Sequence, residues 1–331
     1  MDDESVLKEL SELVKATFLL WEDAWVGFSW KHYYFNHTQR VRALSLEIGR
    51  REGADLRKLE YAALLHDITK RYDGNIITDD QGKRILDESG FWRNELLVPK
   101  RENLITRLFE ENKQYHKLHN VTGAVMAKKI LENYGFSQNF RTSVGFIIEG
   151  HLKPDIFEEK ASSDVLERKI LYEADTIDSN LGLTAFYRNI QIYTHSAIAE
   201  KGAVDLRQYI CRIDKWIKTK SPFIDKMMTR TGTQIARERY RRMGEFSSQI
   251  TEDLQNSFSQ SLEYGILGLI KYFMNCNQYP NLQDEMIYLF AVWIPKYEKM
   301  QKTETNPKAQ LIFQRAVSFC HLLSQEIEGK A

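Results

Sequence analysis

Histidine and aspartate residues recur along the chain at positions from which they could bind a metal ion. Four histidines and two aspartates, including one adjacent His-Asp pair, stand at the ends of apolar segments: His37, His66, Asp67, His119, His151 and Asp175. A buried carboxylate without a counter-charge is costly, and a divalent cation is one way to compensate it. Imidazole and carboxylate together favour Mn, Fe, Co, Ni or Zn over Ca or Mg. These residue types therefore indicate a transition-metal site.

Two helices are expected to position the first three of these residues. Apolar residues follow helical spacing in the segment VRALSLEI after His37, and Gly53 is typical of a helix C-terminus. Asp55 is a suitable N-cap for a second helix, LRKLEYAALL, which leads into the pair His66-Asp67. Because a short turn makes consecutive helices antiparallel, we expect His37 to lie beside that pair.

The rest of the chain also favours helices. Helical patterns cover residues 119–134, 138–151, 164–177, 221–258 and three segments within 259–331. We expect helix breaks near Pro280 and from Pro295 to Pro307. Residues 72–103 are rich in turn-forming residues, so we expect an irregular segment with short helices. The predicted fold class is all-α.

Composition excludes several classes of protein. The chain has 331 residues, 43% of them hydrophobic, and its 46 basic residues balance 46 acidic ones. The hydrophobic content suffices for a core, while zero net charge argues against electrostatic capture of nucleic acid or an anionic membrane. The longest apolar run, residues 286–294, is far shorter than the ~20 residues that span a bilayer. The acidic N-terminus is not typical of a secretory signal, and three dispersed cysteines fit reduced thiols, so we expect a cytoplasmic protein.

The order of one His, a His-Asp pair and a distant Asp resembles the HD-domain superfamily of metal-dependent phosphohydrolases. The segments that carry the resemblance are HTQRV, EGADLRKLEYAALLHDITK, LHNVTGA, IIEGH and LERKILYEADTID. A later stretch, DKMMTRTGTQIARERYRRMGEF, is similar to the C-terminal helix of an HD subgroup that includes nucleotide pyrophosphohydrolases. The resemblance covers about residues 30–250.

The resemblance implies a helical bundle with two metal ions at its centre. One ion would be bound by His37, His66, Asp67 and Asp175. The second would be bound by His119 and His151, with Asp67 bridging the two ions, as in the dinuclear subgroup. His116 is a rival to His119, which we prefer because small residues follow it in NVTGA.

The implied activity is hydrolysis of a nucleotide or related small phosphate ester by a metal-bound hydroxide. Asp67 and Lys70 would be the catalytic residues, and Lys70 and Arg40 would bind the phosphate of the substrate. A di-iron oxygenase of the HD type and a ligand-sensing module without turnover are the alternatives. Neither nucleic acid nor membrane is expected as a partner.

The sequence divides into residues 1–255, the HD bundle with flanking helices, and residues 256–331, a C-terminal helical extension. Three roles stay open for the extension: an interface of a homodimer, a lid, or a surface that binds another protein. Two further clusters are expected to be structural. An aromatic cluster between Trp21 and Phe35 would pack over the bundle, and arginines between Arg230 and Arg242 would form a solvated helix face.

Overall fold

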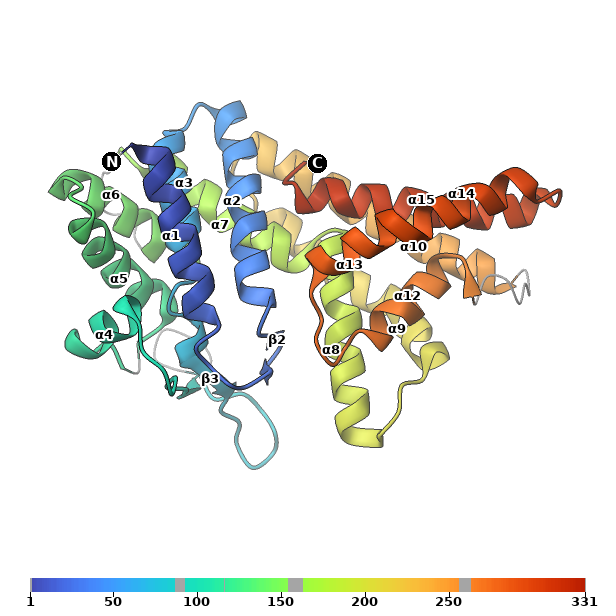
Figure 1. The fold of residues 1–331 in the computed structure, drawn as a ribbon, viewed down its shortest axis with the longest axis horizontal. Helices are drawn as coiled ribbons and strands as arrows, with labels where there is room; N and C mark the ends of the chain where they lie inside the picture. Colours follow the sequence, from blue (N-terminus) through green and yellow to red (C-terminus); the bar gives the residue numbers. More distant parts are fainter. Residues whose placement is uncertain (1, 87–92, 116, 154–162, 256–262, 331) are drawn as a thin grey trace. The chain divides into compact units, whose positions relative to one another are not determined.

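The computed structural model describes residues 2–86, 93–115, 117–153, 163–255 and 263–330. These residues are predominantly helical, with two small two-stranded antiparallel sheets (Figure 1). The all-α prediction is therefore confirmed. Among the residues described, no helix is both long enough and apolar enough to cross a membrane.

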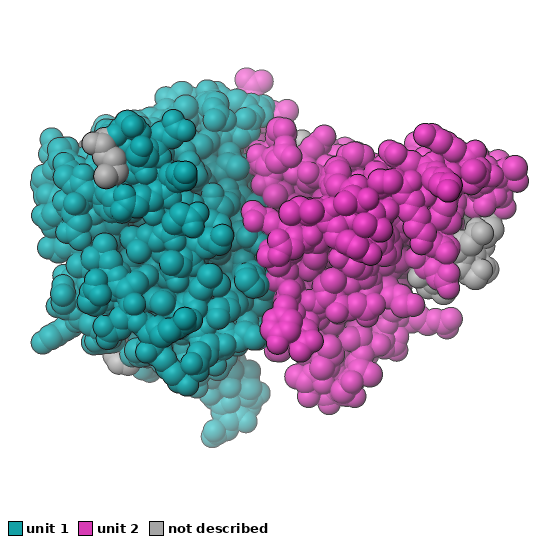
Figure 2. Space-filling view, viewed as in Figure 1, with its two compact units in different colours: residues 1–172 teal, residues 173–331 magenta. Residues whose placement is uncertain are grey.

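The chain divides into two compact units, residues 1–172 and residues 173–331 (Figure 2). The boundary falls within helix α7 (Val165–Asn180). The domain boundary predicted at residue 255 adjoins residues 256–262, which lie outside the described part of the chain, and it stays a prediction.

The first unit is built from helices and two strand pairs that precede α7. Its elements are α1 (Asp3–Phe18), β1 (Trp25–Val26), β2 (Ser29–Trp30), α2 (Tyr33–Glu52), α3 (Leu56–Leu65), the 3-10 turn η1 (Lys70–Tyr72), β3 (Asp73–Ile76), β4 (Asn94–Leu96), α4 (Leu104–Glu111), α5 (His119–Asn133) and α6 (Gln138–Glu149).

The helix ends of this unit follow from local chemistry. The Asp55 carboxylate accepts a hydrogen bond from the backbone N–H of Lys58 and so caps α3. Ser137 caps α6 in the same way. Gly53 ends α2 and Gly135 follows α5, both with the positive φ that glycine adopts readily. The helix boundaries predicted around these residues are confirmed.

The core of the first unit lies between α2, α3, α5 and α6, which pack against one another. The predicted stripe of α2, formed by Val41, Leu44, Ser45 and Ile48, is buried. Most of the aromatic cluster is buried too, with Phe28 as an exposed exception, so the packing interpretation of that cluster is confirmed.

The segment 72–103 differs from its prediction. Strands β3 and β4 pair antiparallel, where short helices were expected, with Asp73 opposite Leu96. Gly74 permits this close pairing, because a Cβ at that position would lie 2.9 Å from the carbonyl oxygen of Glu95. Too few residues are paired to leave a periodic signal in the sequence.

The second unit is entirely helical in its described part. After the end of α7 it contains α8 (Leu183–Lys201), α9 (Leu206–Lys218), the 3-10 helix η3 (Ser221–Lys226), α10 (Arg230–Gln255), α12 (Ile266–Asn275), α13 (Leu282–Tyr288), the π-helical turn η4 (Leu289–Trp293), α14 (Ile294–Thr303) and α15 (Pro307–Ile327).

The long helix predicted from residue 221 is wrong at its start. The chain forms η3, leaves the helical conformation at Met227, and begins α10 only at Arg230. Glu173 causes the break, since its carboxylate accepts hydrogen bonds from the backbone N–H groups of Met228 and Thr229. The sequence of residues 221–230 does not predict this break, because Glu173 lies far away along the chain.

The predicted breaks near Pro280 and within Pro295–Pro307 are confirmed, since residues 276–281 separate α12 from α13 and residues 304–306 separate α14 from α15, but no break occurs at Pro295 itself. Helix continues from α13 through η4 into α14, and Pro295 lies in the first turn of α14. The preceding π-helical turn accommodates the proline, because the altered hydrogen-bond pattern there does not require its missing N–H.

The arginines of α10 do not all lie on a solvated face. Arg239 and Arg242 are buried, with guanidinium nitrogens 3.9 Å and 3.6 Å from the carboxylate of the buried Glu326. The Glu326 carboxylate also accepts hydrogen bonds from the backbone N–H groups of Leu183 and Thr184 at the start of α8. The charges pair because a buried unpaired charge is costly.

A second buried carboxylate makes the stability of this unit depend on pH. Glu285 accepts hydrogen bonds from the Tyr187 hydroxyl (2.9 Å) and the Asn281 backbone N–H (3.2 Å). Burial raises the pKa of Glu285 from 4.5 to about 7, although these hydrogen bonds oppose the rise. The folded protein therefore binds the proton more tightly than the unfolded chain. The resulting stability is present below pH 4.5 and is lost as the pH rises through about 7.

We predict that Glu285→Gln stabilises the protein at alkaline pH, because the amide keeps the acceptor oxygen without a charge. At pH 8.5 the gain in unfolding free energy should be on the order of 3 kcal/mol, and it should shrink toward pH 5. Denaturant unfolding at both pH values measures the difference. Glu298→Gln, at an exposed position of α14, is the control and should show no such dependence. An equal effect of Glu285→Gln at both pH values would contradict the prediction.

Candidate metal centre

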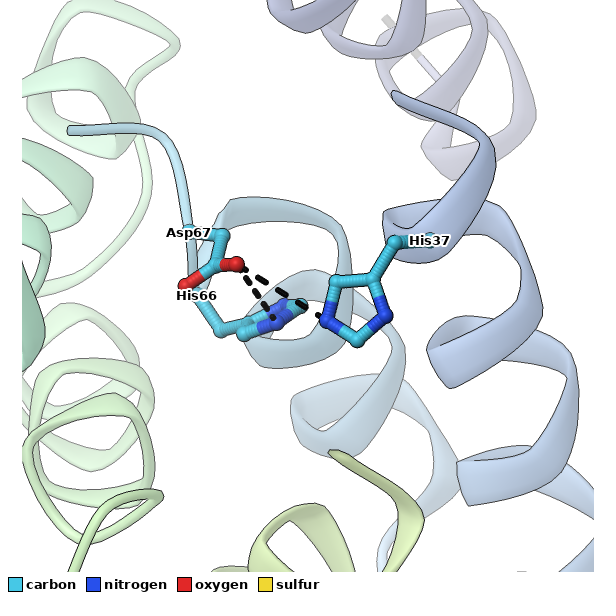
Figure 3. Close-up of side chains that lie close together, drawn as sticks. All are labelled: His37, His66 and Asp67. Carbon is cyan, nitrogen blue, oxygen red and sulfur yellow. Dashed lines mark ion pairs between the residues drawn. The ribbon is translucent and has the colours of Figure 1, made fainter. Parts of the chain in front are cut away.

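The carboxylate of Asp67 lies at the centre of four imidazoles. Its Oδ2 is 3.8 Å from Nε2 of His37 and 3.7 Å from Nε2 of His66 (Figure 3). Its Oδ1 is 3.5 Å from Nε2 of His119 and 3.6 Å from Nε2 of His151. Each carboxylate oxygen therefore faces its own pair of histidines, and all five side chains are buried.

These five residues form two overlapping groups with metal-ligand geometry. In each group, His37–His66–Asp67 and Asp67–His119–His151, the ligand atoms all lie within 4.8 Å of one another. Atoms that share one ion at about 2.1 Å are about 3 to 3.5 Å apart. The observed separations are close to that range and are longer than normal hydrogen bonds. Nε2 of His151 is also buried and has no hydrogen-bond partner in the described part of the chain. The donor set fits a divalent transition metal.

Two of the histidines are held in the tautomer that a metal requires. Nδ1 of His66 lies 2.8 Å from the carbonyl oxygen of Ala63, and Nδ1 of His151 lies 2.7 Å from that of Ile148. A carbonyl only accepts hydrogen bonds, so each Nδ1 carries the proton. In the neutral ring, Nε2 then directs a lone pair toward Asp67, as metal-binding histidines do.

The protonation of the site also suits a metal ion. Burial alone would raise the pKa of Asp67, but the surrounding histidines and the ammonium of Lys70 outweigh it and hold that pKa well below its usual range. Burial, and then the charge of Lys70, lowers the pKa of His119. Near neutral pH, Asp67 is therefore an anion and the ring of His119 is neutral.

Two helix contacts bring these residues together. The start of α2 lies beside the end of α3, so His37 points toward His66 and Asp67 as predicted (Figure 3). On the other side, α5 approaches the end of α3 closely at Gly123, where a Cβ would lie 2.9 Å from the carbonyl oxygen of His66. The expectation that small residues after His119 permit a close helix contact is confirmed.

Hydrogen bonds fix the ends of α5 and α6 at the site. The Thr69 hydroxyl donates to the carbonyl oxygen of His119 at 3.2 Å. The side-chain amide of Asn120 donates to the carbonyl oxygen of Glu149 at 2.7 Å, which links the start of α5 to the end of α6. His119 and His151 are therefore held next to each other.

Asp73 is a residue of this site that the sequence did not reveal. Its Oδ2 accepts a hydrogen bond from Nδ1 of His119 at 2.6 Å and lies 3.4 Å from Nζ of Lys70. Lys70 Nζ is in turn 3.1 Å from Nδ1 of His119. In the sequence, the one feature that could have pointed to Asp73 was its position three residues after Lys70. That spacing brings two side chains together in a helix, but this segment has no helical pattern.

The other predicted site residues lie in different surroundings. Asp175 lies on α7 in the second unit, where it accepts a hydrogen bond from Ser179, and its ligation of a metal stays a prediction. Arg40 is buried with its guanidinium over the ring of Tyr33, which stacks on His37 with ring centres 5.3 Å apart. Contact of Arg40 or Lys70 with a substrate also stays a prediction. His116 lies outside the described residues.

We predict that Gly123→Ala destabilises the fold and weakens metal binding, because the added methyl group pushes α5 away from His66. Overpacking of this kind costs about 1–3 kcal/mol. Gly244→Ala on α10 is the matched control: a Cβ there meets nothing within 4 Å, so the same change should be neutral or slightly stabilising. Thermal unfolding and metal titration of both variants provide the measurement, and equal behaviour of the two would contradict the prediction.

Comparison with known proteins gives one family match. The family model of the HD domain matches residues 34–180, a range that includes all six predicted metal ligands. No curated protein matches the chain.

Several solved structures are similar over most of their length. A predicted HD superfamily hydrolase from an uncultured Thermotogales bacterium is 22% identical, with 77% of this chain and 99% of that chain covered and a TM-score of 0.42. Bacillus subtilis YpgQ in complex with ADP is 20% identical, with 76% and 97% covered and a TM-score of 0.42. The Lin1889 protein from Listeria innocua is 19% identical, with 77% and 98% covered and a TM-score of 0.41.

The family match agrees with the residue order and with the clustering of the histidines around Asp67. The dinuclear subgroup stays a prediction. Residues 34–180 are therefore identified as an HD domain.

Proposed function

We propose that this protein is a metal-dependent phosphohydrolase that acts on a nucleotide or a related small phosphate ester. The observation that carries the proposal is the position of Asp67, whose two carboxylate oxygens each face two imidazole nitrogens. A carboxylate surrounded in this way can bridge two cations. Two adjacent cations are well suited to phosphoryl chemistry, where charge develops on several oxygens at once.

Each of the two groups would hold one ion. His37, His66 and Asp67 would bind the first, and His119, His151 and Asp67 the second. Mn, Fe, Co, Ni and Zn all suit this donor set. When bound, such ions lower the pKa of coordinated water and neutralise charge on phosphoryl oxygens.

The residues of the chain orient the site, exclude most water from it and supply the positive charge of Lys70. The histidine side chains are at most 5% exposed, so charges act on one another through little water. The Lys70 side chain is 28% exposed, and it is therefore the charged group of the cluster with access to an incoming ligand. An ammonium at this edge would bind a phosphate oxygen of the substrate. The balanced net charge supports a small-molecule substrate over nucleic acid or a membrane.

We predict that the metal content follows the two groups. Loaded with Mn²⁺ and freed of excess ion, the protein should retain two ions per chain, His151→Ala one, and Asp67→Ala none. Elemental analysis gives the counts, and His321→Ala, at an exposed position of α15, should match the parent. An unchanged count in Asp67→Ala would contradict the assignment of Asp67 as the bridging ligand.

We predict that the metal-loaded protein releases phosphate or pyrophosphate from a panel of nucleoside mono-, di- and triphosphates. Lys70→Met should raise KM about 10- to 100-fold, because it removes a charge-assisted hydrogen bond. Lys83→Met, which removes an exposed lysine of the same unit, is the control. Oxygen consumption without phosphate release would favour the oxygenase, and nucleotide binding without turnover would favour a sensing module. Either result would overturn the proposal.

A further inference from the structure

We propose that Asp73 is the positioning residue of the second ion site. Its carboxylate holds the Nδ1–H group of His119, so that Nε2 of this ring faces Asp67. The proposal rests on the two-ion site of the proposed function, but it concerns a residue of β3 that the six-ligand pattern does not include.

His119 needs an outside acceptor because of its place in the fold. His66 and His151 follow the ends of α3 and α6, so each ring donates its Nδ1–H to a carbonyl three residues earlier in its own helix. His119 is the first residue of α5, and no preceding turn of that helix offers a carbonyl. The acceptor must come from another element, and the 2.6 Å contact with Asp73 supplies it.

Asp73 is held firmly enough to orient a ring. It begins β3 and is opposite Leu96 of β4, while the backbone N–H of Leu97 donates to the carbonyl oxygen of Tyr72. Gly74 lets the two strands approach closely. The Asp73 side chain is only 16% exposed, so its contact with His119 is little screened by water.

Lys70 shows what Asp73 prevents. Nζ of Lys70 lies 3.1 Å from Nδ1 and 3.3 Å from Nε2 of His119, and it is also 3.4 Å from Oδ2 of Asp73. An ammonium only donates hydrogen bonds. Without the carboxylate, Lys70 could donate to Nδ1, which would favour the Nε2–H tautomer and remove the lone pair that a metal requires. Asp73 occupies the Nδ1–H group and therefore keeps His119 in the Nδ1–H tautomer.

The first measurement is the tautomer of His119 in the full-length, metal-free protein labelled with ¹⁵N-histidine, with its signals identified by their loss in His119→Gln. We expect the Nδ1–H tautomer in the parent. Asp73→Ala should lose it in favour of the Nε2–H form or a mixture. Asp73→Asn should largely keep it, because the amide oxygen still accepts from Nδ1–H. Asp79→Asn is the matched control, since Asp79 is exposed in the same segment and its carboxylate accepts hydrogen bonds from the backbone N–H groups of Gln81 and Lys83.

The second measurement is Mn²⁺ titration of the same proteins. Asp73→Ala should weaken the second ion about 10- to 100-fold and leave the first unchanged. Adding Lys70→Met to Asp73→Ala should recover part of that affinity, because the competing ammonium is gone; a merely structural role of Asp73 predicts no recovery.

The outcomes separate this inference from the proposed function. An unchanged His119 tautomer in Asp73→Ala, or an unchanged affinity for the second ion, would overturn the role of Asp73. A parent protein that shows the expected tautomers but binds fewer than two ions would instead refute the two-ion site. If Asp73→Ala fails to fold, Asp73→Leu, which is closer in size to aspartate but has no acceptor, replaces it in both measurements. An unchanged tautomer or an unchanged second-ion affinity in Asp73→Leu would then overturn the role.

Discussion

The geometry of the HD domain depends on one buried anion, the carboxylate of Asp67. Burial makes this charge costly, and the four imidazoles around it do not donate normal hydrogen bonds to it at the observed distances of 3.5–3.8 Å. The two proposed cations, one on each side of the carboxylate, would offset that cost. The placement of α2, α3, α5 and α6 can then be understood as the way in which four separate segments deliver a ring nitrogen to the same point.

The ends of α3 and α6 orient two of these histidine rings. The last carbonyls of a helix have no partner within the helix, and in α3 and α6 they accept the Nδ1–H of the histidine that follows. One hydrogen bond thus satisfies a helix end and fixes a ring tautomer. A histidine at a helix start has no such carbonyl, which is why His119 depends on a carboxylate from a neighbouring strand. In the second unit, too, backbone N–H groups at helix starts donate to carboxylates from other elements. Glu326 accepts from the first N–H groups of α8, and Glu173 accepts from those just before α10.

Local chemistry made much of the fold predictable. The caps at Asp55 and Ser137, the glycines at positions 53 and 135, and the apolar stripe of α2 act within a few residues of chain, so a pattern records them. The predictions that failed concern distant partners. The break before α10 depends on Glu173, the pairing of β3 depends on β4, and the burial of Arg239 and Arg242 depends on Glu326, none of which neighbours the affected segment in sequence.

The sequence by itself determined the fold class, the family and the identity of the central residues. Residue type and order carry that information, since His and carboxylate groups at helix ends are residue types that can bind a metal ion. The tertiary structure decided how those residues divide: which histidines face Oδ1 and which face Oδ2 of Asp67, and that Asp73 and Lys70 meet His119. These are relations of a few ångströms between side chains on separate elements. They follow from helix packing and strand pairing, which residue spacing along the chain does not specify.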